Sequence, residues 1–314
     1  MADGNQNMAQ MALLVPYGGE KPPAPAWFER AVATPFETRW VEVDGANIRY
    51  QRWGDPAKPG LLMVHGNGAH AHWYDFIAPF FAEDYCVVAM SFGGMGDSDW
   101  REAYSLSSFT AEQLAVCEHA GLFDHDRKPM IIAHSFGGYI TLSTGGQHSD
   151  RFAGMIIVDS VIRHPEDEWD GPPQRGNAHR IYADLKTALS RFRLAPPQTC
   201  ENHYIIDYIA RHSLKEVTNS AGQSGWNWKF DPSLWTRFES MDDPATMFRK
   251  VTCPLSVIRG ENSVLVDERN WTYMRSLRDD VTFVSMPEAA HHLLLDQPLA
   301  FVSVLRTQLA AWAY

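Results

Sequence analysis

The stretch Pro129-Met130-Ile131-Ile132-Ala133-His134-Ser135-Phe136-Gly137-Gly138 decides the fold. Its first half is a short apolar run, which is typical of a buried strand, and its second half sets a serine among small residues. This spacing predicts a sharp strand-to-helix turn that exposes the Ser135 hydroxyl at the edge of a sheet. Ala133 stands where the G-x-S-x-G pattern has its first glycine, and it is still small. Gly137 and Gly138 are expected to let the helix pack closely on the strand.

A nucleophilic serine needs a histidine as its base, and the C-terminal region supplies two candidates. The run Thr282-Phe283-Val284-Ser285-Met286 is typical of a strand, and the loop after it contains the adjacent residues His291 and His292. Histidine has a suitable pKa to take a proton from serine and return it to a leaving group. Adjacent residues of an extended loop point in opposite directions, so only one of the two can face the serine.

An oxyanion site is predicted where an earlier strand ends. The apolar run Leu61-Leu62-Met63-Val64 is typical of a buried parallel strand, and His65-Gly66-Asn67-Gly68 then opens a loop that can approach the serine. The backbone N–H groups of Asn67 and Phe136 are expected to bind the developing oxyanion together. Two such donors contribute about 3 kcal/mol each to acyl transfer. Taken alone, the loop would be an ordinary turn that needs its two glycines.

Two carboxylates compete to orient the histidine. The apolar run Met155-Ile156-Ile157-Val158 ends in Asp159, and a second run, Pro254-Leu255-Ser256-Val257-Ile258-Arg259-Gly260, leads to Glu261. Both carboxylates are expected at the edge where the carboxyl ends of parallel strands meet, which is where such sheets bind ligands. The acid has to hold the histidine tautomer and offset the imidazolium charge. The residues by themselves leave both alternatives open.

Together these segments resemble the α/β-hydrolase fold superfamily, of the type that carries a helical cap, over about residues 36 to 314. The resemblance rests on His65-Gly66, on Gly93-Gly94-Met95-Gly96-Asp97-Ser98, on the turn at Ser135, and on Ala290-His291 running into Asp296-Gln297-Pro298. In that family the catalytic histidine usually follows a glycine and precedes an acidic residue and a proline. The resemblance therefore implies His291 rather than His292, with Ala290 in place of the glycine.

The chain departs from the family pattern at the acid. Members usually carry it a few residues after the glycine that ends the later strand, and Ser263 stands at that position here. Some members place the acid one strand earlier, so the resemblance favours Asp159 over Glu261. Haloalkane dehalogenases and epoxide hydrolases of this fold carry an aspartate as nucleophile. Because Ser135 forms acyl intermediates instead, their chemistry is not expected.

The remaining pattern alternates strands with helices. It predicts an α/β fold with a mostly parallel, doubly wound sheet, built from residues 36–161 and 251–314. Residues 1–35 contain several prolines and are expected to form an N-terminal arm. The alternation stops between residues 162 and 250, which are predicted to be a helical cap, or lid, inserted after the sixth strand. Helices are expected at residues 73–83, 107–121, 137–146, 179–192 and 204–217.

Tryptophans concentrate in the predicted cap and suit a large apolar or aromatic substrate. The expected pocket residues are His70, Trp73, His134, Trp169, Trp226 and Trp228. Alternatively, the tryptophans only join the cap helices to one another. The spacing of His70 and His72 is typical of a metal pair, but no third ligand is apparent nearby in the sequence. Neither a metal nor a cofactor is therefore expected.

Composition narrows the classes of partner. The chain has 314 residues, is 45% hydrophobic and 21% charged, and carries a formal net charge of −11. That charge argues against nucleic acid or an anionic membrane as a partner, and no apolar run is long enough to span a membrane. The 4 cysteines do not form a disulfide framework in a chain of this length, and no signal-peptide pattern is seen. A cytoplasmic protein is expected, with a small-molecule substrate; a homodimer is left open.

These observations predict a serine hydrolase that cleaves a carboxylic ester or lactone with an apolar or aromatic body. Ser135 would attack the carbonyl, with His291 as base and the acyl-enzyme cleared by water. One alternative is hydrolysis of a carbon–carbon bond in a vinylogous keto acid, for which Arg163 or Arg180 could bind the substrate carboxylate. Another is a ligand-binding protein of low turnover on the same fold.

Overall fold

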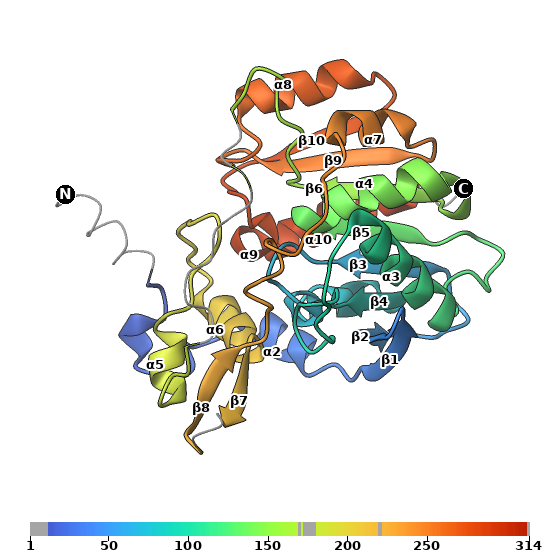
Figure 1. Ribbon diagram of the computed structural model, residues 1–314. Coiled ribbons are helices and arrows are strands. Elements are labelled where there is room, and N and C mark those ends of the chain that lie inside the picture. The colour runs from blue at the N-terminus through green and yellow to red at the C-terminus, as the bar shows by residue number, and fades with distance from the viewer. Residues whose placement is uncertain (1–11, 169–170, 172–179, 219–221, 313–314) are drawn as a thin grey trace.

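An eight-stranded sheet with helices on both faces forms the centre of the computed structural model, which describes residues 12–168, 171, 180–218 and 222–312 (Figure 1). The strand order is β1-β2-β4-β3-β5-β6-β9-β10. β2 is antiparallel to both of its neighbours, and the other pairs are parallel. The predicted fold class, a mostly parallel doubly wound α/β sheet, is therefore confirmed. The strands are β1 Glu37–Val43, β2 Ala46–Trp53, β3 Gly60–Val64, β4 Cys86–Met90, β5 Met130–His134, β6 Gly154–Val158, β9 Leu255–Gly260 and β10 Thr282–Met286.

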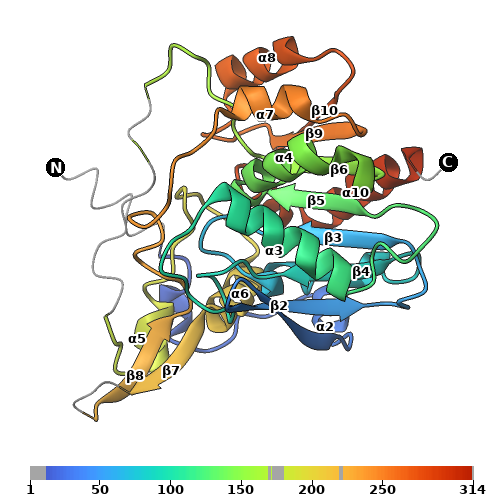
Figure 2. The ribbon, with the colours of Figure 1, turned by 45° about the vertical axis from the view of Figure 1, so that its right-hand side comes forward.

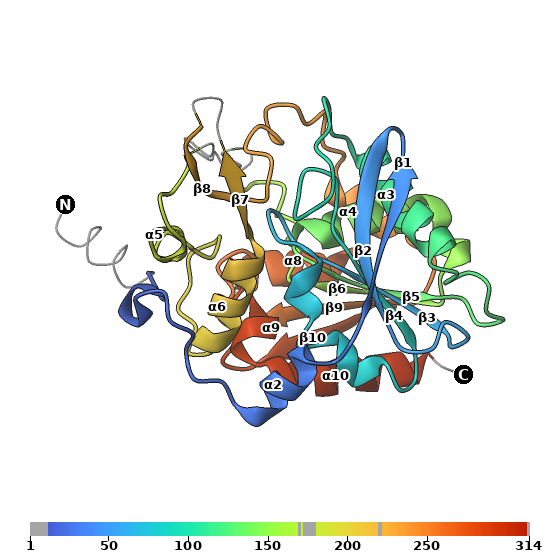
Figure 3. The same cartoon turned by 90° about the horizontal axis from the view of Figure 1, so that it is seen from below.

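Two apolar cores cover the two faces of the sheet. Along β3, Leu62 and Val64 join one core and Leu61 and Met63 join the other, as expected for a strand buried on both faces. The first core includes side chains of α3, α4, α7 and α8, and the second includes side chains of α2, α6, α9 and α10. Figure 3 shows α3 and α4 on one side of the sheet and α2 and α10 on the other. The helices are α2 Ala26–Val32, α3 Leu106–His119, α4 Phe136–His148, α5 Leu185–Leu189, α6 His203–His212, α7 Pro244–Lys250, α8 Glu268–Leu277, α9 Leu293–Asp296 and α10 Pro298–Ala311. None of the helices in the described ranges has the length and apolar character that a membrane crossing requires.

One predicted helix of the sheet region is wrong. Residues 73–83 contain two short 3-10 segments, η2 (Ala71–Tyr74) and η3 (Ala78–Phe81), and no α-helix. Pro79 lacks the N–H that a continuous helix would need at that position. The segment is also buried over most of its length, so it lacks the polar face of a surface helix.

The segment after β6 is mixed rather than helical. It contains α5 and α6, followed by a hairpin of β7 (Leu214–Thr218) and β8 (Ser224–Trp228) (Figure 2). The helix predicted to run to residue 217 ends at His212, because the residues that follow pair with β8. α7, which also falls within residues 162–250, packs against α4 of the sheet region. We use "cap" below for α5, α6 and the β7–β8 hairpin.

The described part of the N-terminal arm fastens α6 of the cap to the sheet region. The Phe28 ring on α2 packs edge-on against Tyr204 and Tyr208 of α6, with ring centroids 4.9 and 5.7 Å away. Arg211 on α6 donates a hydrogen bond of 2.6 Å from Nη2 to the carbonyl oxygen of Gly19. The described part of the arm therefore packs against the cap through Gly19 and α2.

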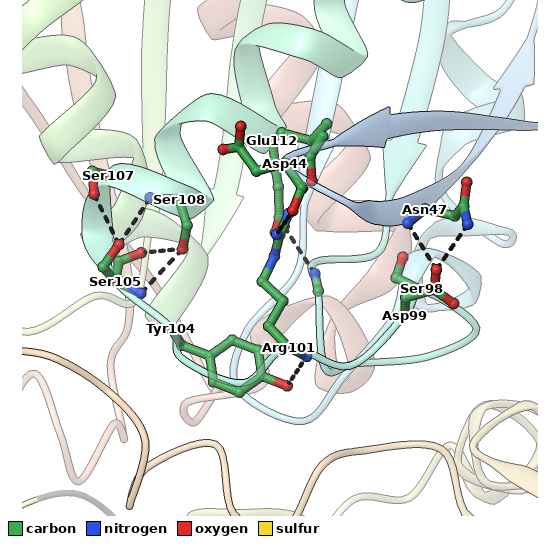
Figure 4. A network of polar contacts seen from close by, with 12 residues as sticks. Asp44, Asn47, Ser98, Asp99, Arg101, Tyr104, Ser105, Ser107, Ser108 and Glu112 are labelled. Atoms are coloured by element: carbon green, nitrogen blue, oxygen red, sulfur yellow. Dashed lines mark hydrogen bonds and ion pairs between the residues drawn. The ribbon is translucent and has the colours of Figure 1, made fainter.

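A buried ion pair anchors the glycine-rich turn after β4 (Figure 4). Arg101 Nε donates to Glu112 Oε1 at 2.8 Å, and the Gly93 N–H donates to Glu112 Oε2 at 2.8 Å. Burial raises the pKa of Glu112 to about 7, although both donors oppose the shift. Arg101 Nη2 also donates to the carbonyl oxygen of Val43 at 2.7 Å, so the turn is tied to β1 and α3. Contacts within the protein therefore hold the glycine-rich turn in place.

Candidate active site

Ser135 occupies a strained turn between β5 and α4. Its φ of 54° and ψ of −123° are rare for a residue with a side chain and cost on the order of 1–3 kcal/mol. The turn is held from β6 and the residues after it: Ser135 donates its N–H to the Val158 carbonyl at 2.8 Å, and Ser160 Oγ donates to the Ser135 carbonyl at 2.6 Å. The neighbouring strand therefore maintains the conformation that the sequence motif predicts.

The two glycines after Ser135 permit close packing at the start of α4. A Cβ atom on Gly137 would collide with the carbonyl oxygen of His65, and one on Gly138 would collide with Ser160 Oγ. The loops after β3 and β6 therefore both press against the first turn of this helix. Any larger residue would push the serine away from these loops.

His291 and Asp159 form a buried pair at the same edge of the sheet. His291 follows β10 and Asp159 follows β6, and the distance from Nδ1 to Oδ1 is 2.7 Å, with 2% and 0% of the side chains exposed. Asp159 also accepts from Ser263 Oγ at 2.6 Å through Oδ1 and from the Gly260 N–H at 2.8 Å through Oδ2. Because the carboxylate only accepts, Nδ1 of His291 carries the hydrogen, which leaves the lone pair of Nε2 as an acceptor.

The other candidate acid lies apart from this pair. Glu261 is exposed, and its Oε2 accepts a hydrogen bond of 3.3 Å from the backbone N–H of Glu288. Ser263, which stands where the family usually has its acid, instead supports the carboxylate of Asp159. The sequence showed that Ser263 departs from the family pattern, but it did not predict that this serine would donate a hydrogen bond to Asp159.

The loop after β3 lies directly against the serine. A Cβ atom on Gly66 would lie 3.0 Å from Ser135 Cβ, so only a glycine fits there without displacement. The Phe92 N–H donates to His65 Nε2 at 3.1 Å, so Nδ1 of His65 donates to the Gly66 carbonyl at 2.7 Å. Burial lowers the pKa of His65 to about 4, which keeps this ring neutral and its hydrogen bonds in place.

The two predicted oxyanion donors have unused N–H groups. Within the described ranges, the backbone N–H groups of Asn67 and Phe136 donate to no protein acceptor. Asn67 follows Gly66, which lies against Ser135, and Phe136 follows Ser135 itself. Unpaired donors beside a nucleophile are suited to a negatively charged oxygen.

Two cavities open beside these residues. The larger has a volume of about 500 Å³ and the smaller about 260 Å³. The larger is lined by Ser135, Phe136, Tyr139, Asp159, Ser160, Val161, Ile162, Arg163, His164, Pro165, Asp167, Met241, Asp242, Asp243, Pro244 and Leu265. The smaller is lined by Asn67, Gly68, Trp73, Arg191, Phe192, Arg193, Leu194, Ala195, Ser213, Trp228, Phe230 and His292.

Only some of the predicted pocket residues line the two cavities. Trp73 and Trp228 line the smaller cavity, whereas Trp226 lines neither of these two cavities and pairs through its backbone with Tyr182. His70 is buried and its Nε2 lies 2.8 Å from Ser213 Oγ, outside both linings. His134 is also buried and lines neither cavity, and Trp169 lies outside the described residues. Sequence reasoning missed the apolar lining from Val161, Ile162, Met241 and Leu265, for which no local motif exists.

The rings of three histidines lie close to one another after β5 and β10. The ring centroid of His291 lies 4.8 Å from that of His134 and 4.7 Å from that of His292. Burial lowers the pKa of His134 to about 3 and that of His292 well below its ordinary value. The nearby His291 ring lowers both pKa values further, although the hydrogen bond to the His291 carbonyl opposes the shift of His134. His134 Nε2 lies 3.0 Å from the carbonyl oxygen of His291. Two neutral rings therefore flank His291, and one of them also holds its backbone.

The chain is similar to known proteins over most of its length. The alpha/beta hydrolase family matches residues 61–304. Esterase Rv0045c of Mycobacterium tuberculosis is 22% identical over 277 residues, which are 84% of this chain and 87% of that protein. A structure of it, from work on its transition metal inhibition, has a TM-score of 0.66 at 18% identity and covers 95% of this chain and 97% of that one.

Two further proteins show the same relationship. The pimeloyl-[acyl-carrier protein] methyl ester esterase of Chromobacterium violaceum is 23% identical over 261 residues, 81% of this chain and 96% of that protein. The thioesterase domain from the curacin biosynthetic pathway has a TM-score of 0.70 at 21% identity, covering 86% of this chain and 99% of that one. Since the family match spans most of the sequence, the chain belongs to the alpha/beta hydrolase family.

Proposed function

We propose that this chain is a serine hydrolase that cleaves a carboxylic ester or lactone with an apolar or aromatic body through an acyl-enzyme. The observation that carries the proposal is the buried His291–Asp159 pair, 2.7 Å apart, at the edge of the sheet where Ser135 occupies its strained turn. The relatives named as esterases support the reaction class without identifying the substrate.

Each group has one role in the proposed reaction. His291 takes the hydroxyl proton of Ser135 as Oγ attacks the carbonyl carbon, and Asp159 stabilises the resulting imidazolium. The N–H groups of Asn67 and Phe136 bind the oxyanion. His291 then gives the proton to the leaving alcohol oxygen. In the second half, water loses a proton to His291 and attacks the acyl carbon, which releases the carboxylic acid and restores Ser135.

The larger cavity favours an uncharged substrate body. It contains Ser135 itself, and much of its lining is apolar, with Tyr139, Ile162 and Leu265 among the residues. Its charged lining residues are Arg163 and four aspartates, so the lining carries more negative than positive charge. An anionic acyl or alcohol group would be repelled there, whereas an apolar one is accommodated.

A carbon–carbon bond hydrolase is the second candidate, and one observation favours it. Arg163 lines the same cavity as Ser135 and has no ion-pair partner among the described residues. It is therefore available to bind the carboxylate of a vinylogous keto acid. Arg180, the other cation considered, lies over the Tyr182 ring and lines neither of the two cavities.

Hydrolysis of p-nitrophenyl esters of increasing acyl length tests the proposal. We expect a burst and steady turnover with the wild type, and a loss of several orders of magnitude in Ser135→Ala. Ser107→Ala, which changes an exposed serine on α3, is the matched control and should behave as wild type. If the wild type shows neither burst nor turnover, the ester proposal is wrong. A ligand-binding protein on this fold would keep its ligand affinity in Ser135→Ala, and a carbon–carbon hydrolase would depend on Arg163.

A further inference from the structure

The smaller cavity differs from the larger one in the sign of its charge. Arg191 and Arg193, which follow α5 of the cap, line the smaller cavity, and its described lining contains no aspartate or glutamate. The larger cavity is lined by four aspartates and by Arg163. An anion is therefore repelled by the cavity that contains Ser135 and attracted by the other one.

The two arginines of the smaller cavity have no acidic partner. Neither forms an ion pair with any residue of the described chain. Arg193 Nη1 donates to the carbonyl oxygens of Ser190 and Phe192 at 2.8 and 2.7 Å, which orients the guanidinium and leaves its other nitrogens without an acceptor in the described ranges. Burial lowers the pKa of Arg193, and the charge of Arg191 lowers it further. An anion bound by both groups would relieve this repulsion.

A buried donor without a partner lines the same cavity. The Trp73 side chain belongs to a residue that is 7% exposed, and its Nε1–H has no acceptor among the described residues. An indole nitrogen only donates, so burying it is unfavourable unless a ligand accepts from it. The other polar lining residues, Asn67, Ser213 and His292, add no charge, since burial lowers the pKa of His292 well below its ordinary value.

The two cavities lie on either side of the proposed oxyanion site. Asn67 lines the smaller cavity and Phe136 lines the larger one. A carbonyl bound by the backbone N–H groups of both residues can therefore extend one substituent into each cavity. The smaller cavity is thus within reach of a substrate that reacts with Ser135.

We propose that the smaller cavity binds an anionic group of the substrate, a carboxylate or a phosphate, remote from the ester bond that is cleaved. Guanidinium groups bind both anions through paired N–H donors, and the indole N–H of Trp73 adds a third donor group. The substrate is then an ester with an apolar part in the larger cavity and a charged end in the smaller one. This assignment rests on the proposed function and refines its substrate class.

Rates with two matched esters test the assignment. Mono-4-nitrophenyl adipate ends in a carboxylate, and 4-nitrophenyl 6-methylheptanoate has an uncharged isopropyl group of similar shape in its place. We expect kcat/KM of the wild type to favour the adipate ester by about tenfold, and Arg191→Gln and Arg193→Gln each to lose most of this preference. Added NaCl should also reduce it. Arg275→Gln, at an exposed site on α8 that lines neither cavity, removes the same charge and should behave as wild type.

Two outcomes of these rates would overturn the proposal. One is a wild type that hydrolyses both esters with equal kcat/KM. The other is a preference that disappears in Arg163→Gln and persists in Arg191→Gln, because the anion would then bind in the larger cavity. No side-chain hydrogen bond of Arg191 is found in the described ranges, so Arg191→Gln alone is sufficient if circular dichroism shows that Arg193→Gln is not folded.

Calorimetric titration of Ser135→Ala separates binding of the anion from catalysis. This variant lacks the nucleophile, so the intact esters can be titrated. We expect the adipate ester to bind about tenfold more tightly than its uncharged counterpart, and the difference to be lost when Arg191→Gln is added. 4-Nitrophenyl 5-phosphonopentanoate identifies which anion is preferred, and tighter binding of either charged ester supports the site. Equal affinities for all three esters would contradict it. If the wild type hydrolyses none of them, the proposed function fails, and the titration still decides whether the cavity binds an anion.

Discussion

Two buried histidine–aspartate pairs in this molecule have the same local geometry and different surroundings. His291–Asp159 and His72–Asp75 each join Nδ1 to a carboxylate oxygen over 2.7 Å. Asp159 of the first pair lines the larger cavity together with Ser135, whereas His72 and Asp75 do not line it. A histidine held by an aspartate is therefore not a catalytic group by itself; the residue beside its other nitrogen decides what it does.

The hydrogen bonds to the two carboxylates show what each pair connects. The donors to Asp159 besides His291 are Gly260 and Ser263, so this carboxylate is held where β9 ends. The donors to Asp75 besides His72 are Gln51 on β2 and Tyr208 on α6. The second pair therefore joins the cap to the sheet region, and we expect it to stabilise the fold rather than take part in the reaction.

The largest expected difference between the two pairs is the loss of catalytic activity when the aspartate of each pair is replaced. Asp159→Asn keeps the shape of the side chain and removes the charge that stabilises the His291 imidazolium, so kcat for ester hydrolysis should fall by about 10⁴-fold. Asp75→Asn should change kcat by less than about threefold. Steady-state rates with p-nitrophenyl acetate measure both, with circular dichroism to establish folding. Equal losses in the two variants would contradict the distinction.

The second prediction concerns the contribution of the His72–Asp75 pair to the stability of the fold. Asp75→Asn weakens three buried hydrogen bonds to a carboxylate, and we expect the free energy of unfolding to fall by about 2 kcal/mol. Urea unfolding followed by tryptophan fluorescence measures it, and Asp84→Asn at an exposed site provides the control. A stability equal to that of the wild type would mean that this pair does not hold the cap.

The first pair also shows how far the sequence predicts the site. The candidate nucleophile Ser135, the candidate base His291 and the two proposed oxyanion donors were predicted from short motifs, because each depends on a turn a few residues long. The acid could not be chosen in this way. Asp159 and Ser263 are 104 positions apart and meet only because β6 and β9 are neighbours in the sheet. Strand order is a property of the whole fold, so the motifs left Glu261 open as an alternative.

The cap was predicted less well for a related reason. The sequence predicted its place after β6 and its change of composition, but residues 214–218 form a strand where a helix was expected. That strand exists because it pairs with residues 224–228, a contact that local propensity does not report. In the same way, the packing of the cap decides that Trp228 lines a cavity beside the site and that Trp226 does not.

A smaller effect is expected from the serine that replaces the usual acid. Ser263→Ala removes the hydrogen bond of 2.6 Å to Asp159 and leaves the one from Gly260, so kcat should fall by about tenfold, or about 1.4 kcal/mol. Ser263→Thr keeps the hydroxyl, so we expect most of the wild-type rate in this variant. If Ser263→Ala lost activity because of altered packing, Ser263→Thr would not be expected to recover it. Loss of activity in both variants would mean that position 263 acts through packing.

The smallest expected effect is on the pH dependence of stability, and it concerns the surroundings of the His72–Asp75 pair. The ring of His212 stacks on His72, and burial, followed by the neighbouring His72, lowers its pKa to about 4. The unfolded chain binds a proton at this histidine below about pH 6.5, whereas the folded chain does so only below about pH 4. The free energy of unfolding should therefore decrease as the pH falls through this interval. His212→Asn should remove on the order of 1 kcal/mol of the decrease between pH 7 and pH 5, measured by urea unfolding, and His148→Asn at the end of α4 should not. If His212→Asn leaves the decrease unchanged, the acid sensitivity of the molecule arises at other histidines, and the joint between cap and sheet does not control it.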